Sequence, residues 1–306
     1  MRTLQRTWEN FNLSAPVRFE VPLAEYTTFR VGGPAEALVF PRSSDELTEV
    51  LRRLADERIP VTILGGGANV VISDRGIRGV VVHTGGLNRL ESDAATVYAG
   101  AGRAISEVAA FAADLDLVGL EWIYAMPGSV GGAVWMNARC YGGEIAEVIG
   151  PVSFVTLEGT PGRYTPDPGD FAYKVSPFQS GGRIITEVTF HLTDSRGAGG
   201  SLWERMREIE ADRREKGHFD APCAGSIFKN DRRYGEPSGR IIDRLGLRGL
   251  RRGGALISPK HGNIIINTGG ATAREIRDLV TEVSDRVYGE TGFRLDPEVL
   301  FLGEWS

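Results

Sequence analysis

Residues 125–143 read AMPGSVGGAVWMNARCYGG, a stretch that places five glycines around the apolar run 133–136. Glycine lacks a Cβ, so a backbone of this composition can lie close to a ligand and can adopt positive φ. The order of residues predicts a tight turn that leads into a short helix, and free N–H groups at such a helix start suit a phosphate. The candidate binding residues are Pro127, Gly128, Ser129, Gly131 and Gly132.

A second glycine loop, GGGAN, follows the apolar segment 61–64. The chain has 40 glycines in 306 residues, roughly twice the usual ~7%, so one such cluster alone would favour a simple turn. Two clusters, each after an apolar segment, favour a nucleotide cofactor with a diphosphate. Val70 stands where a dinucleotide fingerprint needs its third glycine, and no Gly-Lys-Ser/Thr of a P-loop is present. The candidate binding residues are Gly65, Gly66, Gly67, Ala68 and Asn69.

The composition is that of an ordinary globular protein, with 42% hydrophobic and 25% charged residues. The length predicts two or three domains. The formal charge of −5 gives no indication of nucleic-acid binding. Two cysteines without metal-ligand spacing predict a reducing compartment and no metal site. Without a signal-peptide pattern or an apolar run of about 18 residues, we expect a cytoplasmic protein that does not insert into membranes.

Periodicity predicts a mixture of helices and strands. Residues 1–42 are interpreted as a short leader followed by strands at 28–31 and 35–40. Ser43 and Glu46 fit a capping box before a helix that ends by Pro60, and Thr272 and Glu275 fit a second box before a long helix. Asp194 to Gly200, DSRGAGG, is the best linker candidate. Further strands are expected at 61–64, 70–73, 79–84, 96–100, 152–157, 184–192 and 264–267, and further helices at 105–115, 202–216 and 238–245.

Four successive blocks carry a family resemblance: TTFRVGGPA from Thr27, LGGGANV from Leu64, GLE from Gly119 and PGSVGGA from Pro127. Together they resemble the UDP-N-acetylenolpyruvoylglucosamine reductase family, flavoenzymes that complete UDP-N-acetylmuramate in bacterial wall synthesis. The resemblance continues to the C-terminus and covers nearly the whole chain. It implies FAD and NADPH as cofactors and UDP-N-acetylglucosamine enolpyruvate as substrate. Ala125 and Met126 stand where members often have Gly-Ile. We expect the backbone to tolerate this departure if φ is negative there.

The resemblance also implies a fold. We expect an α+β protein with a two-part FAD-binding domain of the PCMH type, similar to vanillyl-alcohol oxidase, and a C-terminal α+β substrate domain. The first flavin subdomain would cover 1–59, joined by a final strand at 294–306, and the second would cover 60–195. The substrate domain would cover 196–293. The length of the chain between Ile184 and Ser226 favours the shorter subclass, which lacks both a tyrosine-bearing substrate loop and an extra βαβ element.

Three catalytic residues are implied by matching blocks. Ser226, in GSIFKN, takes the place of the serine that protonates the substrate, and Glu298, in PEV, is the second acid of the site. At period two, Glu298 would share a strand face with Leu300 and Leu302. Lys174 stands where the family has an arginine, and it keeps the charge without the bidentate fork. The implied substrate-binding residues are Lys229, Asn230, His261 and Asn263.

Two alternatives stay open beside this reductase. One is an oxidoreductase of the same FAD-binding fold that acts on another substrate. The other is a flavin- or nucleotide-binding module without catalysis, which the blocks around Ser226 and Glu298 disfavour. A purely structural protein would leave the two glycine loops without a reason. We expect a monomer.

Overall fold

The computed structural model describes residues 2–305, which divide into two compact units. Both units are discontinuous in sequence, and the boundary near residue 211 lies inside a helix. The three-part division at residues 59, 195 and 293 stays a prediction. Unit 1 comprises Met1–Phe19, Glu36–Gly66 and Gly79–Ala211, and unit 2 comprises Glu20–Ala35, Gly67–Arg78 and Asp212–Ser306.

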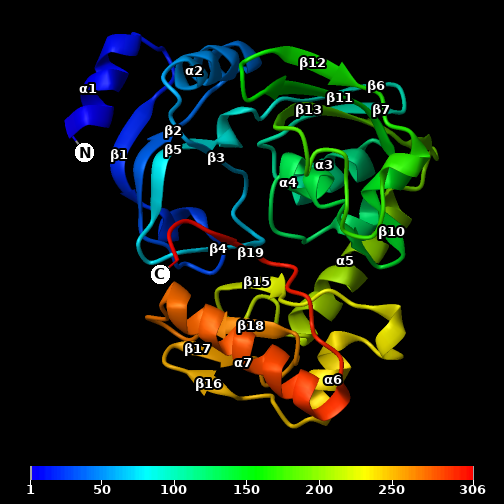
Figure 1. Cartoon of the computed structure of the whole chain (residues 1–306). Helices are drawn as coiled ribbons and strands as arrows, with labels where there is room; N and C mark the ends of the chain where they lie inside the picture. Colours follow the sequence, from blue (N-terminus) through cyan, green and yellow to red (C-terminus); the bar gives the residue numbers. More distant parts are fainter. Residues whose placement is uncertain (1, 306) are drawn as a thin grey trace. The chain divides into compact units, whose positions relative to one another are not determined.

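A four-stranded sheet begins unit 1, with α2 beside it (Figure 1). Its strands, in spatial order, are β1 (Val17–Pro22), β2 (Pro34–Val39), β5 (Ile77–His83) and β3 (Val61–Leu64). The Ser43 side chain accepts the Glu46 N–H and so begins α2, as predicted. The Glu46 carboxylate, however, accepts the N–H of Arg42, so only half of the predicted capping box forms. The helix α2 (Ser44–Asp56) buries Leu47, Val50, Leu51 and Leu54.

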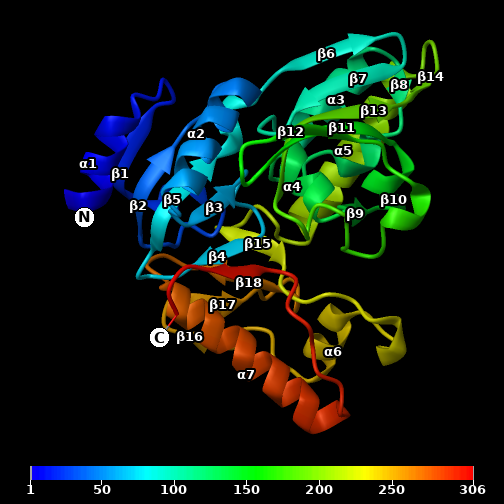
Figure 2. The same ribbon diagram turned by 45° about the horizontal axis from the view of Figure 1, so that its top comes forward.

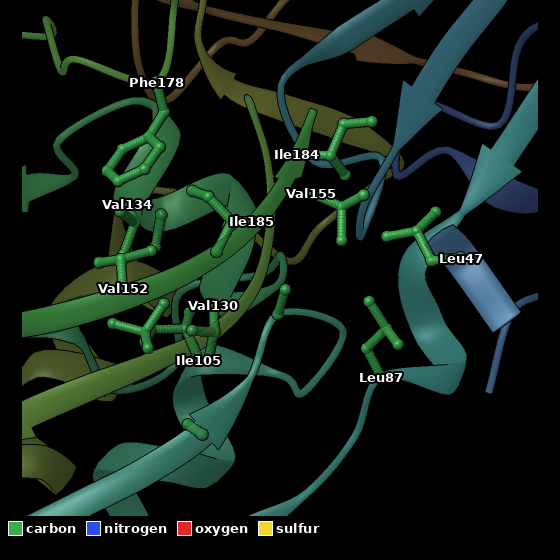
Figure 3. Packing of buried hydrophobic residues seen from close by; sticks show 14 of the residues in the cluster. Leu47, Leu87, Ile105, Val130, Val134, Val152, Val155, Phe178, Ile184 and Ile185 are labelled. Carbon is green, nitrogen blue, oxygen red and sulfur yellow. The ribbon is translucent and has the colours of Figure 1, made fainter. Parts of the chain in front are cut away.

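A five-stranded antiparallel sheet forms the other half of unit 1. In Figure 2, α3 and α4 lie on one face of this sheet. The close view in Figure 3 shows Ile105, Val130 and Val134 from these helices packed with Val152 and Ile185 from the strands. The strands, in spatial order, are β12 (Pro161–Tyr164), β11 (Ile149–Thr156), β13 (Arg183–His191), β7 (Thr96–Gly100) and β6 (Leu90–Asp93), and the helices are α3 (Ile105–Asp114) and α4 (Val130–Trp135).

The shorter elements of unit 1 include one that the sequence analysis missed. The expected leader forms α1 (Arg2–Phe11), whose Leu4, Trp8 and Phe11 are buried in the same core. The predicted linker is partly helical, because α5 (Gly199–Glu215) begins at Gly199. Two small strand pairs complete the unit: β8 (Leu117–Val118) with β14 (Thr193–Asp194), and β9 (Arg139–Cys140) with β10 (Gly143–Glu144).

Unit 2 has a core of its own, formed by a four-stranded antiparallel sheet with α7 packed across it (Figure 2). The sheet order is β15 (Cys223–Ser226), β18 (Ile264–Asn267), β17 (Ala255–Ile257) and β16 (Arg251–Arg252). The predicted capping box of Thr272 and Glu275 is confirmed at the start of α7. The remaining elements are α6 (Ser238–Arg244), α7 (Ala273–Thr291) and the parallel pair β4 (Val70–Ile72) and β19 (Leu300–Leu302).

Two expectations about strands are wrong. Residues 28–31 form a turn, because Arg30 has φ 55° and the Thr27 hydroxyl bonds to both the N–H and the C=O of Val31. Glu298 does not share a strand with Leu300, since β19 begins only at Leu300. It lies in the irregular segment before this strand and is half-buried.

Candidate active site

The two glycine loops are in direct contact in unit 1. A Cβ added to Gly66 would lie 2.7 Å from the Cα of Gly128 and 2.9 Å from the N atom of Ser129. The Ser129 hydroxyl accepts N–H groups from both loops, from Gly66 and from Gly132, each at 3.3 Å. Only glycine fits this approach, because any side chain at residue 66 would push the loops apart. The structure therefore brings together the two segments that the sequence analysis singled out.

The expected free N–H groups at the start of α4 are largely used within the protein. Val130 donates to the C=O of Arg103, and Gly131 donates to the C=O of Ala101. Within residues 2–305, the N–H groups of Gly128 and Ser129 have no acceptor. The turn before α4, rather than the helix itself, is thus the part that can bind an anion.

The rest of the first loop belongs to unit 2. Gly67 has φ 61°, and a Cβ there would collide with the C=O of Tyr26. In the described chain, the N–H groups of Gly67, Ala68 and Asn69 also have no acceptor. Three consecutive N–H groups of this kind form a concave donor site for an anion such as a phosphate.

A hydroxyl beside this loop was given no role by the sequence analysis. Thr28 Oγ1 is buried, and no described residue offers it a hydrogen bond. Its backbone N–H donates to the C=O of Gly67 at 3.1 Å. A buried polar atom without a partner is costly, so it indicates a ligand that completes the site. The sequence signal that could have identified Thr28 is its place in the TTFRVGGPA block. Together, the Thr28 hydroxyl and the three N–H groups without an acceptor fit the diphosphate-bearing cofactor that the sequence predicts.

The segment that carries Lys174 is bound to the end of the central glycine stretch in unit 1. The C=O of Trp135 accepts the Ser176 hydroxyl at 2.7 Å and the Gln179 amide at 3.0 Å. Asn137, only 1% exposed, donates to the C=O of Ala172. Lys174 is half-buried with φ 60°. These hydrogen bonds attach the backbone around Lys174 to the residues that follow α4.

Ala125 departs from the expectation of a negative φ. Its φ is 56°, and the Ser106 hydroxyl accepts its N–H at 2.9 Å. A left-handed conformation costs a residue with a Cβ roughly 1–2 kcal/mol. A glycine at this position would avoid this cost.

Backbone hydrogen bonds in unit 2 bring Ser226 and Glu298 into one small region. Ser226 ends β15, and the C=O of the next residue, Ile227, accepts the Glu298 N–H at 2.7 Å. The Asn69 side chain donates to the C=O of Glu298 at 3.0 Å. The C=O of Asn69 accepts the N–H of Leu300 at 3.0 Å. These hydrogen bonds link Asn69 of the glycine loop, Glu298 and the residue after Ser226 into one network, which we call the hydrogen-bonded frame.

The four predicted substrate-binding residues have different surroundings. Lys229 is on the surface and pairs with Asp296 at 2.8 Å. The side-chain Oδ1 of Asn230 accepts the N–H of Ser238, where α6 begins. Asn263 is 3% exposed and bonds to the backbone of Phe228. Only Lys229 therefore presents a charged group at the surface.

His261 is half-buried, and its Nδ1 accepts the N–H of Asn263 at 3.1 Å. Burial lowers the pKa of His261, and it lowers the pKa of the neighbouring His218 to about 4. Burial also raises the pKa of the Cys223 thiol, which packs in the core of unit 2. The neutral imidazole of His261 acts here as an acceptor for the backbone.

Residues 2–305 lack two other features that could indicate a function, a metal-binding cluster and a membrane-spanning helix. No group of three or more His, Cys, Asp or Glu side chains there could hold a metal ion. No helix in that part of the chain combines the length and apolar character needed to cross a bilayer.

Comparisons with known proteins extend these observations. An FAD binding domain model matches residues 35–163, and a model of the UDP-N-acetylenolpyruvoylglucosamine reductase C-terminal domain matches residues 217–302. They confirm the predicted fold class, a flavin domain followed by a C-terminal substrate domain.

Curated reductases of that name from Treponema denticola and Borreliella burgdorferi are 40% and 37% identical to this chain. The matches cover 95% of this chain and 94% of the Treponema protein, and 92% and 93% for the Borreliella protein. The solved structure of UDP-N-acetylenolpyruvylglucosamine reductase from Thermus caldophilus matches with a TM-score of 0.78 and 32% identity, covering 94% of this chain and 99% of that one. The chain belongs to the UDP-N-acetylenolpyruvoylglucosamine reductase family.

Proposed function

We propose that this chain is an NADPH-dependent flavoenzyme that reduces UDP-N-acetylglucosamine enolpyruvate to UDP-N-acetylmuramate, a precursor of peptidoglycan. In enzyme nomenclature it would be a UDP-N-acetylmuramate dehydrogenase, an oxidoreductase of CH–CH groups with NADP⁺ as acceptor. The observation that carries the proposal is the hydrogen-bonded frame of Ser226, Glu298 and Asn69 in a chain of this family.

Backbone groups would hold the FAD. The N–H groups of Gly67, Ala68 and Asn69 suit its diphosphate, and neither Gly66 nor Gly128 places a side chain where the two loops meet. The turn at Gly128 and Ser129 offers two more N–H groups. When bound, the flavin supplies the hydride chemistry, taking a hydride from NADPH and giving it to the substrate.

The side chains would manage charge and protons on the substrate. Addition of hydride to the terminal vinyl carbon of the enolpyruvyl group leaves negative charge on the adjacent carbon and the carboxylate. The Lys174 ammonium would stabilise that charge, and Glu298 would do so as a neutral carboxylic acid that donates a hydrogen bond. The Ser226 hydroxyl would then give its proton to the adjacent carbon. A serine is a weak acid, so this step depends on the close alignment of Ser226 with a strongly basic carbon.

Substrate binding is proposed for Lys229, Asn230 and His261. The Lys229 ammonium would leave Asp296 for the diphosphate of the substrate. Asn230 would bind next to Lys229, and His261 would contribute from the segment just before β18. The lysine at residue 174 provides charge without a bidentate fork, so we expect looser binding of the carboxylate than an arginine provides.

Rapid mixing tests this function in two steps. The protein is reconstituted with FAD and reduced anaerobically with one equivalent of NADPH, and UDP-N-acetylglucosamine enolpyruvate is then added while the visible flavin absorbance is followed. We expect bleaching in the first step and prompt return of the oxidised spectrum in the second. Ser226→Ala should retain the first step and slow the second about 10²–10⁴-fold. Ser201→Ala, an exposed serine on α5, is the matched control and should behave as wild type.

Each alternative predicts a different trace. Bleaching by NADPH without reoxidation by this substrate would favour an oxidoreductase of the same fold with another substrate. Flavin binding without any bleaching would favour a non-catalytic module. Full second-step activity in Ser226→Ala would remove Ser226 from its role as the acid.

We further propose that the protein works in the cytoplasm as a monomer. Cys140 and Cys223 are free thiols, which suits a reducing compartment. Size-exclusion chromatography with light scattering measures the mass in solution, and a stable dimer would contradict the monomer.

A further inference from the structure

Asn263 makes an unusual set of hydrogen bonds just before β18. Its side-chain Nδ2–H donates to the C=O of Phe228, and its Oδ1 accepts the N–H of the same residue, both at 2.9 Å. Its own C=O accepts the N–H of Ile227 at 2.9 Å. The side chain is thus bonded to both polar groups of one residue, in the manner of a neighbouring β-strand.

This arrangement continues a ladder that is irregular at Ser226. β15 pairs with β18 at Cys223 with Ile266 and at Ser226 with Ile264, with a register shift between them. Gly225 has φ 68° inside the shift. A bulge of this kind re-aims a side chain and weakens local pairing. Beyond the end of β15, the backbone C=O of Asn263 bonds to Ile227 and its carboxamide bonds to Phe228, so pairing continues along one side of residues 227–228.

The other side of the same segment is bonded to the residues around Glu298. The C=O of Ile227 accepts the Glu298 N–H, and the backbone N–H of Lys229 donates to the C=O of Asp296 at 2.9 Å. Phe228 and Pro297 form an isolated antiparallel bridge. Residues 227–229 therefore lie between Asn263 and the segment that carries Glu298.

We propose that Asn263 is a positioning residue for the reaction, which fixes the register of Ser226 and Glu298 through the backbone of Phe228 and does not itself contact the substrate. This revises its assignment as a substrate ligand. With 3% of its surface exposed, and with both ends of its carboxamide used, Asn263 has little capacity left for a ligand. The His261 Nδ1 holds the N–H of Asn263 and so supports the same segment. The inference rests on the proposed function.

Asn263→Asp is the most direct test, with Asn267→Asp as its matched control. The aspartate retains the acceptor for Phe228 N–H but loses the donor, and its charge faces the C=O of Phe228. Asn267 lies at the other end of β18, is 6% exposed and bonds to the C=O of Phe29, so its variant makes the same chemical change away from Ser226. Both variants are compared with wild type per bound flavin.

We expect Asn263→Asp to bleach with NADPH at the wild-type rate but to reoxidise with UDP-N-acetylglucosamine enolpyruvate about 10²-fold more slowly. The substrate concentration for half-maximal rate should change little. Lowering the pH from about 8 to about 5 should restore part of the rate, because a protonated aspartic acid can again donate to Phe228. Asn267→Asp should reoxidise near the wild-type rate at both pH values.

Three results would overturn the inference. They are an unchanged reoxidation rate in Asn263→Asp, a raised half-maximal concentration with an unchanged maximal rate, and an equal loss in Asn267→Asp. If Asn263→Asp does not retain flavin, Asn263→Ser, which removes the amide without adding charge, is measured in the same way. Wild-type protein that fails to reoxidise with this substrate would instead contradict the proposed function.

Discussion

Gly66 is the residue on which the proposed FAD site depends most directly, because it lies against Gly128 of the other glycine loop. Gly66→Ala should strongly reduce flavin binding, because the added Cβ would lie 2.7 Å from Gly128 Cα and neither backbone can move without opening the loops. The visible flavin absorbance per protein after reconstitution measures this loss. Gly200→Ala is the control, since nothing lies within 4 Å of a Cβ there and its φ is not positive. Wild-type flavin content in Gly66→Ala would contradict the proposal that the contact between the two glycine loops is needed to bind FAD.

Residue types and residue roles were predictable to different degrees. The glycine loops could be found from sequence, because glycine is the residue that such close approaches require. The role of Asn263 could not, since a buried asparagine in KHGN has the same letters whether it binds substrate or the backbone of Phe228. The unpartnered hydroxyl of Thr28 was equally hidden, because burial of a single atom depends on residues far away in the chain.

At the scale of elements, local signals predicted α7 well and residues 28–31 badly. The capping box and apolar period of α7 are contained in one segment, and they agree with the packing of Leu279 and Val283. Thr28 to Val31 has the composition of a strand, but the Thr27 hydroxyl satisfies the backbone of Val31 and removes the need for a strand partner. Similarly, α1 was missed although Leu4, Trp8 and Phe11 have helical spacing.

Two substitutions in α7 should have opposite effects on stability. Thr272→Ala removes the cap that accepts the Glu275 N–H, and we expect it to lower the free energy of unfolding by about 1 kcal/mol. Gly289→Ala is exposed within the same helix with free space around its Cβ, so it should raise that free energy by about 0.5–1 kcal/mol. Urea denaturation followed by circular dichroism measures both changes. A change of the same sign in the two variants would contradict this account of α7.

At the scale of the whole molecule, the discontinuity of unit 2 matters most. Sequence comparison defines a C-terminal domain at 217–302, but the unit also contains residues from 20–35 and 67–78. β19 pairs with β4, and the Asp74 carboxylate accepts the N–H groups of Ala273 and Arg274 at the start of α7. Such long-range pairings leave no local signal in the sequence.

A fragment of residues 212–306 should therefore not fold as a stable domain by itself. It lacks the partner of β19 and the carboxylate at the start of α7, and it loses Phe29, Val31 and Val71 from its core. Burial of each of these side chains contributes about 1.5–3 kcal/mol, and the fragment lacks this contribution, which is large beside the 5–15 kcal/mol that stabilises a typical protein. Hydrogen exchange of the fragment should show little protection in α7, whereas the full chain should protect it. Cooperative unfolding of the fragment with protected α7 amides would show that residues 212–306 contain all that unit 2 needs, and that the two N-terminal segments only join a domain already formed.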